Sequence, residues 1–144
     1  MFLRSLNLRN TEVRSYCWPL FLMLTVFGLS GSSQLAVPDL SYLFAPDKIG
    51  HFLVFGLIAT SLLRTPYLCR KNKFGVLLAI IITTSYGFFD EWRQASTPGR
   101  NVEVADWVAD SLGAIVASIA YNRLHIYRSL LEYQIRRKIK SSTH

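Results

Sequence analysis

Charged residues and cysteines are both scarce in this chain of 144 residues. Charged residues make up 17% of it, against about 25% in typical soluble domains. The two cysteines, Cys17 and Cys69, form neither a CxxC pair nor the paired pattern of a disulfide framework. HExxH and GxSxG motifs are absent, and Ser96 and Ser111 lack the context of a nucleophile. The sequence therefore offers no disulfide scaffold and no familiar hydrolase or metalloprotease motif.

Apolar residues, by contrast, make up 51% of the chain, and the mean hydropathy is +0.25. They are gathered in blocks rather than spaced as on one face of a soluble helix or strand, which indicates that lipid is the solvent. We therefore predict an all-α fold, a four-helix transmembrane bundle. The four blocks are residues 16–29, 49–63, 74–89 and 104–121.

The basic residues set the expected orientation of these helices. All but three of the 16 Lys and Arg residues lie in the N-terminus, the second connector or the C-terminal tail. The positive-inside rule then places both termini in the cytoplasm. We predict a basic N-terminus at 1–15, a transmembrane domain at 16–122 and a basic tail at 123–144. The basic residues that give the net charge of +7 lie between the apolar blocks and not along one face of a soluble helix, so nucleic-acid binding is not expected.

Two features of the ends allow alternative interpretations. The first block is preceded by arginines and followed by small residues, as in a signal peptide, although residues 31–36 form a poor cleavage site. We expect a retained helix, with Pro19 in its first turn, where its missing N–H costs nothing. The tail either lies along the anionic cytoplasmic leaflet or serves only to enforce topology.

The second and third blocks are short for membrane spans. Their uncharged stretches hold 15 and 16 residues, whereas crossing a core of about 30 Å takes about 20. Basic residues bound both stretches at the cytoplasmic end, so the helices must extend at the outer end unless the bilayer thins. The extension takes in Asp47 and Lys48 in the second helix, and Asp90, Glu91 and Gln94 in the third.

Within the last three helices, polar residues recur at spacings that place them on one helical face. A charged group at this depth costs a few kcal/mol when it faces lipid tails. We therefore predict that the polar faces turn toward one another and line a pocket at the extracytoplasmic leaflet. The faces comprise Asp47, His51 and Phe55, then Asp90 and Gln94 with Glu91 beside them, then Asp106, Asp110 and Gly113.

A simpler explanation is that these charges only anchor the ends of the helices. Asp47 and Asp106 open their helices, where the helix dipole favours acidic residues. That explanation suits His51 and Asp110 less well, because each lies a full turn deeper. A turn signal at 97–100 brings Arg100 over the acids, as their counter-ion or as a clamp for a phosphate or carboxylate.

Several of these residues stand in a distinctive order and spacing. They are Asp47-Lys48-x-x-His51-Phe52, Tyr86-Gly87-x-x-Asp90-Glu91-x-x-Gln94, Pro98-Gly99-Arg100, Asp106 and Gly113-Ala114. Together they resemble the VanZ-like family, which is named after a protein associated with low-level teicoplanin resistance in bacteria. The resemblance covers residues 47–117 and the hydropathy of the first helix. It implies a bacterial multi-pass membrane protein, without supplying a settled reaction. Asp110 departs from it, because the family commonly has Asn there.

The first functional hypothesis is an enzyme that acts at the outer leaflet on a lipid or lipid-linked envelope precursor. His51 would be the general acid or base, tuned by Asp47. The candidate catalytic residues are His51, Asp47, Glu91 and Asp90. The candidate substrate-binding residues are Lys48, Gln94, Arg100, Asp106 and Asp110.

Two further classes stay open. A non-catalytic module would use the same pocket to bind a head group or glycopeptide, or would support a partner protein. A transporter fits least well, because the ionisable residues are confined to one leaflet. No metal ligands are assigned, although carboxylates with His51 are a set that also suits a divalent cation. The expected partners are membrane lipids.

Overall fold

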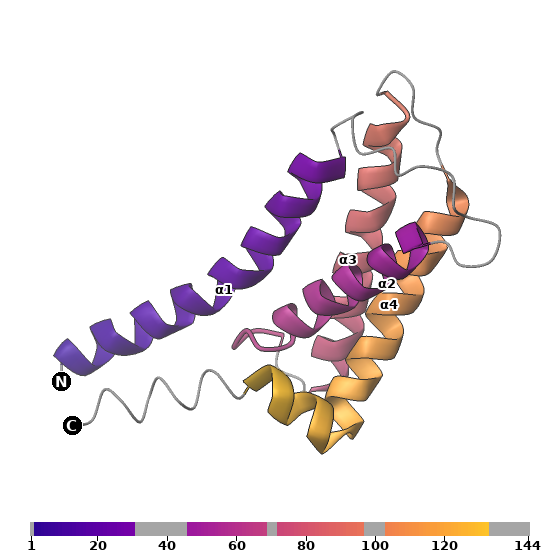
Figure 1. Cartoon of the computed structure of the whole chain (residues 1–144). Coiled ribbons are helices and arrows are strands. Elements are labelled where there is room, and N and C mark those ends of the chain that lie inside the picture. Colours follow the sequence, from indigo (N-terminus) through magenta and orange to yellow (C-terminus); the bar gives the residue numbers. More distant parts are fainter. Residues whose placement is uncertain (1, 31–45, 69–71, 97–102, 133–144) are drawn as a thin grey trace.

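The computed structural model describes residues 2–30, 46–68, 72–96 and 103–132, and the regular secondary structure in these ranges is helical. Successive helices run in opposite directions, so the ends of α1 and α3 lie on the same side as the beginnings of α2 and α4 (Figure 1). The predicted all-α class is confirmed. The helices are α1 (Phe2–Ser30), α2 (Pro46–Leu62), α3 (Lys73–Gln94) and α4 (Val104–Arg123), followed by a helical segment at 125–132.

The sequence supplies ordinary signals at the helix ends. Pro46 opens α2, where a missing N–H is tolerated. The Asn72 side chain caps α3 by accepting a hydrogen bond from the Phe74 N–H at 3.0 Å. In α4, Asp106 lies in the first turn and Arg123 in the last, where each charge is favoured by the helix dipole. The bounds of α2 and α3 confirm that both helices continue past their apolar blocks into the polar residues.

Helix α1 corrects one expectation. It begins at Phe2 rather than near Tyr16, so Pro19 lies in the interior of the helix and not in its first turn. Proline there removes one backbone hydrogen bond. The helix extends this far because residues 2–15 contain neither Gly nor Pro. Its N-terminal half runs away from the other helices (Figure 1).

The most extensive helix contact joins α2 to α4 and depends on small residues. A Cβ added to Gly113 would overlap the backbone carbonyl of Phe52, and one added to Gly56 would lie 3.0 Å from the Ala117 Cβ. Small residues at such positions allow helices to approach closely in membranes. An apolar core adjoins this contact and contains Ile58, Leu62, Leu63, Leu68, Ala79 and Tyr121.

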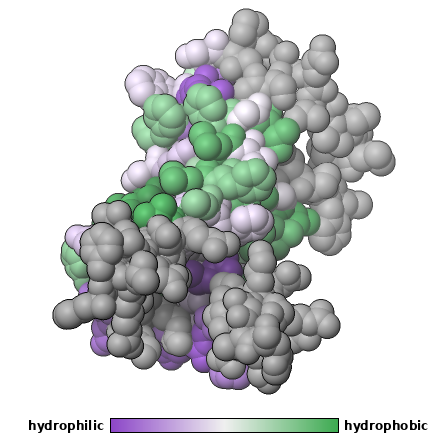
Figure 2. All heavy atoms as spheres, turned by 90° about the vertical axis from the view of Figure 1, so that its left-hand side faces the viewer, coloured by the Kyte–Doolittle hydropathy of each residue, from purple (hydrophilic) through white to green (hydrophobic). Residues whose placement is uncertain are grey.

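The helices expose apolar side chains and bury polar ones. Leu24, Leu77, Ile81, Leu112 and Ile119 are exposed, as are many other large apolar residues. Figure 2 shows apolar residues across the middle of one face, with hydrophilic residues gathered below them. A contiguous apolar surface of this kind is suited to lipid rather than water.

By length and composition, α3 and α4 are able to cross a membrane, and most of each faces outward. The apolar parts of α1 and α2, Ser15–Ser30 and Lys48–Leu62, are shorter.

Several hydroxyl groups inside the helices find partners in their own helix. The Thr60 hydroxyl donates to the Gly56 carbonyl at 3.0 Å, and the Thr83 hydroxyl donates to the Ala79 carbonyl at 2.8 Å. Ser61 does the same with the carbonyl of Ile58. Such local bonds let polar residues lie in an apolar environment without a tertiary partner.

Candidate functional site

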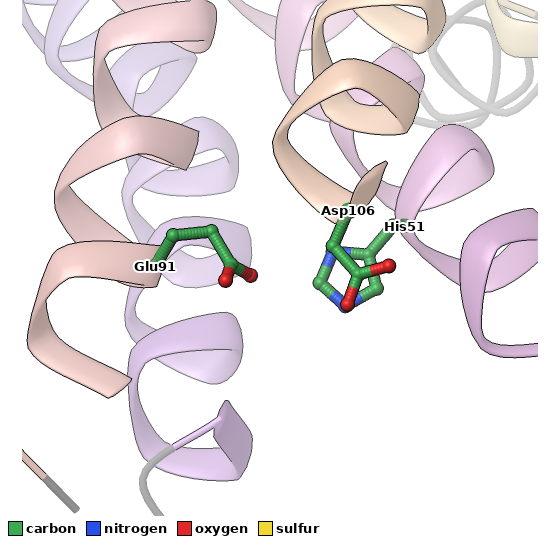
Figure 3. A group of neighbouring side chains, drawn as sticks. All are labelled: His51, Glu91 and Asp106. Carbon is green, nitrogen blue, oxygen red and sulfur yellow. The ribbon is translucent and has the colours of Figure 1, made fainter. Parts of the chain in front are cut away.

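Polar residues converge where α2 begins, α3 ends and α4 begins. They lie close together, and we call them the His51 cluster. Figure 3 shows three of its side chains, each from a different helix. The members are Lys48, His51, Glu91, Glu103, Asp106 and Asp110.

Lys48 joins α2 to the start of α4. Its ammonium group donates to Glu103 Oε2 at 2.7 Å and to Asp106 Oδ1 at 2.8 Å. Glu103 is exposed and precedes α4. The Lys48 hydrogen bond holds the pKa of the Glu103 carboxyl below its usual range, because the nearby cation favours the charged form.

His51 pairs with a carboxylate from α4. Its Nδ1 lies 2.9 Å from Asp110 Oδ1, and its ring stacks on Phe55 with centroids 6.1 Å apart. Asp110 is only 1% exposed. Gly87 of α3 makes room for it, since a Cβ there would lie 2.7 Å from Asp110 Oδ2. The imidazole is thus held in place by a buried acid and an aromatic ring.

Glu91 reaches the cluster from α3. It is 4% exposed, and its Oε2 accepts a hydrogen bond from the Glu103 backbone N–H at 3.3 Å. Its Oε1 is buried and has no hydrogen-bond partner among the described residues. In Figure 3 its carboxylate points toward His51 and Asp106. These three residues offer ligand atoms that lie within 4.8 Å of one another.

A second group, which we call the Arg93 cluster, consists of Ser30, Asp90, Arg93 and Gln94. Asp90 is its centre. Its Oδ1 accepts from the Ser30 hydroxyl at 2.7 Å and from Arg93 Nη2 at 3.0 Å, and its Oδ2 accepts from Gln94 Nε2 at 3.0 Å. The charge of Asp90 is therefore balanced by Arg93 of its own helix, and its carboxylate also contacts Ser30 at the end of α1.

Arg93 and Tyr86 also bind the main chain of α1. Arg93 Nη2 donates to the Phe27 carbonyl at 2.9 Å, and the guanidinium lies 4.1 Å from the centroid of the Phe27 ring. The Tyr86 hydroxyl donates to the Met23 carbonyl at 2.6 Å. These contacts attach the C-terminal half of α1 to α3.

The structure places the predicted site residues in different groups. Asp90 and Gln94 belong to the Arg93 cluster and so face α1. Among the described side chains, the acid paired with His51 is Asp110, and tuning by Asp47 stays a prediction. Arg100 and the side chain of Asp47 lie outside the described residues. Those that meet in the His51 cluster are Lys48, His51, Glu91, Asp106 and Asp110.

Three participants were not singled out from the sequence. Arg93 stands three residues after Asp90, the spacing of an ion pair on one helix face, so the sequence did carry a signal for it. Glu103 immediately precedes α4, and its contact with Lys48 depends on how two helices pack. Ser30 lies 60 residues before Asp90, and no sequence pattern links the two.

Comparison with known protein families gives a match. The family model described as VanZ/LLP1 matches residues 4–126, a range that contains both clusters. No curated protein and no solved structure matches the chain.

Proposed function

The chain belongs to the VanZ/LLP1 family, and on this premise we propose a function for it. It is a multi-pass protein of the bacterial cytoplasmic membrane, and its His51 cluster lies at the extracytoplasmic leaflet. There it acts on a lipid or a lipid-linked cell-envelope precursor. The observation that carries the proposal is the pair of His51 and Asp110, 2.9 Å apart, beside the buried carboxylates of Glu91 and Asp106.

The proposed topology has four spans with both ends in the cytoplasm. Two helices have the length and composition of spans, and the alternating direction of the four helices supports the same role for α1 and α2 (Figure 1). Arg64 and Arg123 lie at the ends of α2 and α4, opposite the His51 cluster. Because basic residues favour the cytoplasmic side, that cluster belongs outside.

Reporter fusions test this topology directly. Fusions after Ser41 and after Gly99 are expected to read as extracytoplasmic, and a fusion after Lys71 as cytoplasmic, since the helices alternate in direction. Paired alkaline-phosphatase and fluorescent-protein reporters at each site would control for poor expression. A cytoplasmic reading at Gly99 would contradict the proposed orientation.

The chemistry of the cluster supports proton transfer. Imidazole exchanges protons near neutral pH, and Asp110 acts as a positioning residue that fixes the ring. Lys48 is partly exposed at the edge of the cluster and offers a positive charge to an anionic head group. This set of residues supports general acid–base chemistry on a head group held at the interface.

One observation favours a second candidate, a module that binds without catalysis. The Ser111 hydroxyl donates to the Trp107 carbonyl at 2.8 Å, so it is engaged with its own helix. Within the described ranges, the His51 cluster contains no Ser, Thr or Cys that would act as a nucleophile. In this alternative the cluster binds a head group or glycopeptide, or the helices support a partner protein.

Profiling a deletion strain tests the function and separates the candidates. Lipidomics and muropeptide analysis are expected to show one precursor class accumulating while its product falls, and the wild-type gene on a plasmid should restore both. If the binding module is correct, a component changes in distribution or amount with no precursor–product relation. Unchanged lipid and muropeptide profiles would contradict the proposed substrate class.

A further inference from the structure

The geometry points to a divalent metal site formed by His51, Glu91 and Asp106. The inference goes beyond the proposed function, because metal binding requires no lipid substrate. It also revises one part of it, since in the metal-bound form His51 is a ligand and does not transfer a proton. The three residues come from α2, α3 and α4, and their ligand atoms lie within 4.8 Å of one another (Figure 3). Ligands bound at about 2.0–2.2 Å from one ion lie about 3–4 Å apart. If the three ligand atoms move about 1 Å closer together, their spacing is that of ligands around one ion.

The orientation of His51 is the first independent support. Its Nδ1 lies 2.9 Å from Asp110 Oδ1, and because a carboxylate accepts, this contact favours the tautomer in which Nδ1–H donates and Nε2 is the acceptor nitrogen. Metal-binding histidines are commonly fixed in this way by a carboxylate on the other ring nitrogen. Gly87 provides the space that Asp110 occupies. The Asp110 carboxylate thus fixes the orientation of the histidine and is not one of the three metal ligands.

Glu91 is the second support. Its side chain is buried and aimed at His51 and Asp106, yet its Oε1 has no hydrogen-bond partner in the part of the chain that the structure describes. A buried polar atom without a partner is costly, and more so when it carries charge. A cation between the three side chains would supply the missing interaction.

The charges of the cluster call for a cation as well. The cluster holds four carboxylates and one ammonium group, and among the described residues Lys48 forms ion pairs with Glu103 and Asp106. Glu91 and Asp110 have no Lys or Arg partner among the described residues. Arg100, which lies outside those residues, is the rival counter-ion, and the experiment below separates the two.

The ligand types indicate which ions fit. One imidazole and two carboxylates, with no thiolate, suit Mn²⁺ or Zn²⁺ better than Cu⁺ or Ca²⁺. Three protein ligands leave at least one coordination position for water or for an oxygen of an anionic head group. The bound cation would then offset the negative charge of the cluster, so that the cluster repels a phosphate less.

Metal content tests the site. Full-length protein in nanodiscs is stripped with chelator, incubated with Mn²⁺ or Zn²⁺ separately and dialysed, and metal is counted by inductively coupled plasma mass spectrometry. We expect about one ion per chain for at least one metal, and at least tenfold weaker binding in His51→Ala and Glu91→Gln. Asp90→Asn is the matched control, because it removes the same charge from the adjacent residue but leaves the three ligands in place.

A spectroscopic readout covers the case in which a variant misfolds. With Mn²⁺ bound to the wild type, pulsed electron paramagnetic resonance should detect coupling to a ¹⁴N nucleus, which only His51 supplies among the three ligands. Absence of that coupling, and in the Zn²⁺ arm equal binding by folded His51→Ala and wild type, would each overturn the site. Failure of the wild type to bind metal would also overturn the site. Binding by Arg100→Ala but not by the wild type would do so too, since Arg100 would then fill the site in the wild type.

Discussion

Replacing Gly113 by alanine is expected to remove most of the folded protein from the membrane. The added Cβ would overlap the Phe52 carbonyl, and backbone cannot move aside as a flexible side chain does. Overpacking typically costs about 1–3 kcal/mol, and a clash with backbone belongs at the upper end. Because the stability of a whole domain is only about 5–15 kcal/mol, abundance should fall several-fold.

Gly50→Ala is the matched control for this change. Gly50 lies in α2 as Gly113 lies in α4, and an added Cβ meets no atom of the described residues within 4 Å. Alanine there should be neutral or stabilise by up to about 1 kcal/mol, since it favours the helix. The measurement is membrane abundance together with thermal unfolding in detergent. Equal behaviour of the two variants would contradict the close α2–α4 contact.

The same contact governs the candidate site. Phe52 follows His51 directly, and Gly113 lies one turn after Asp110 on α4. Forcing α2 and α4 apart at Gly113 would therefore separate His51 from Asp110. Any folded Gly113→Ala protein is expected to lose function along with stability.

Replacing His51 by alanine is expected to lower turnover of the envelope substrate by about 10²–10⁴-fold, the usual contribution of a proton-transfer group. Asp110→Asn should cost less, because the amide still reaches the ring but no longer fixes its protonation. The measurement is restoration of the deletion strain's lipid and muropeptide profiles by each variant. Abundance in the membrane must be matched to wild type.

His125 provides the control for this experiment. It is exposed and lies after α4, away from the His51 cluster, so His125→Ala should restore the profiles fully. The comparison separates a requirement for this histidine from a general effect of removing one. Full restoration by His51→Ala at normal abundance would show that the cluster is not the functional site.

The sequence was informative about the fold where one physical constraint dominated. Apolar blocks and the thickness of a bilayer predicted the helices and their extension into Asp47, Lys48, Asp90 and Glu91, because hydrophobic length is a local property. The start of α1 was predicted wrongly. Its basic first half contains no helix breaker, but an apolar-block criterion does not detect a helix outside the blocks.

The candidate site was predictable in part for the same reason. Helical spacing, together with the cost of charges that face lipid, placed His51 and Asp110 on faces that meet, and the structure has them in contact. Spacing did not predict that Asp90 and Glu91 belong to different clusters, because a partner of Asp90 is Ser30 in α1. How α1 packs depends on contacts between residues about 60 positions apart, and neither composition nor periodicity encodes them.

The way in which α1 is attached has an evolutionary consequence. The members of the His51 cluster come from α2, α3, α4 and residue 103, and none comes from α1. Two of the hydrogen bonds that hold α1, those from Arg93 and Tyr86, end on backbone carbonyls. A carbonyl is present whatever the side chain. Apart from Phe27 and Ser30, whose side chains contact Arg93 and Asp90, we therefore expect the residues of α1 to tolerate change more readily than those of the His51 cluster as lipid composition or neighbouring proteins change.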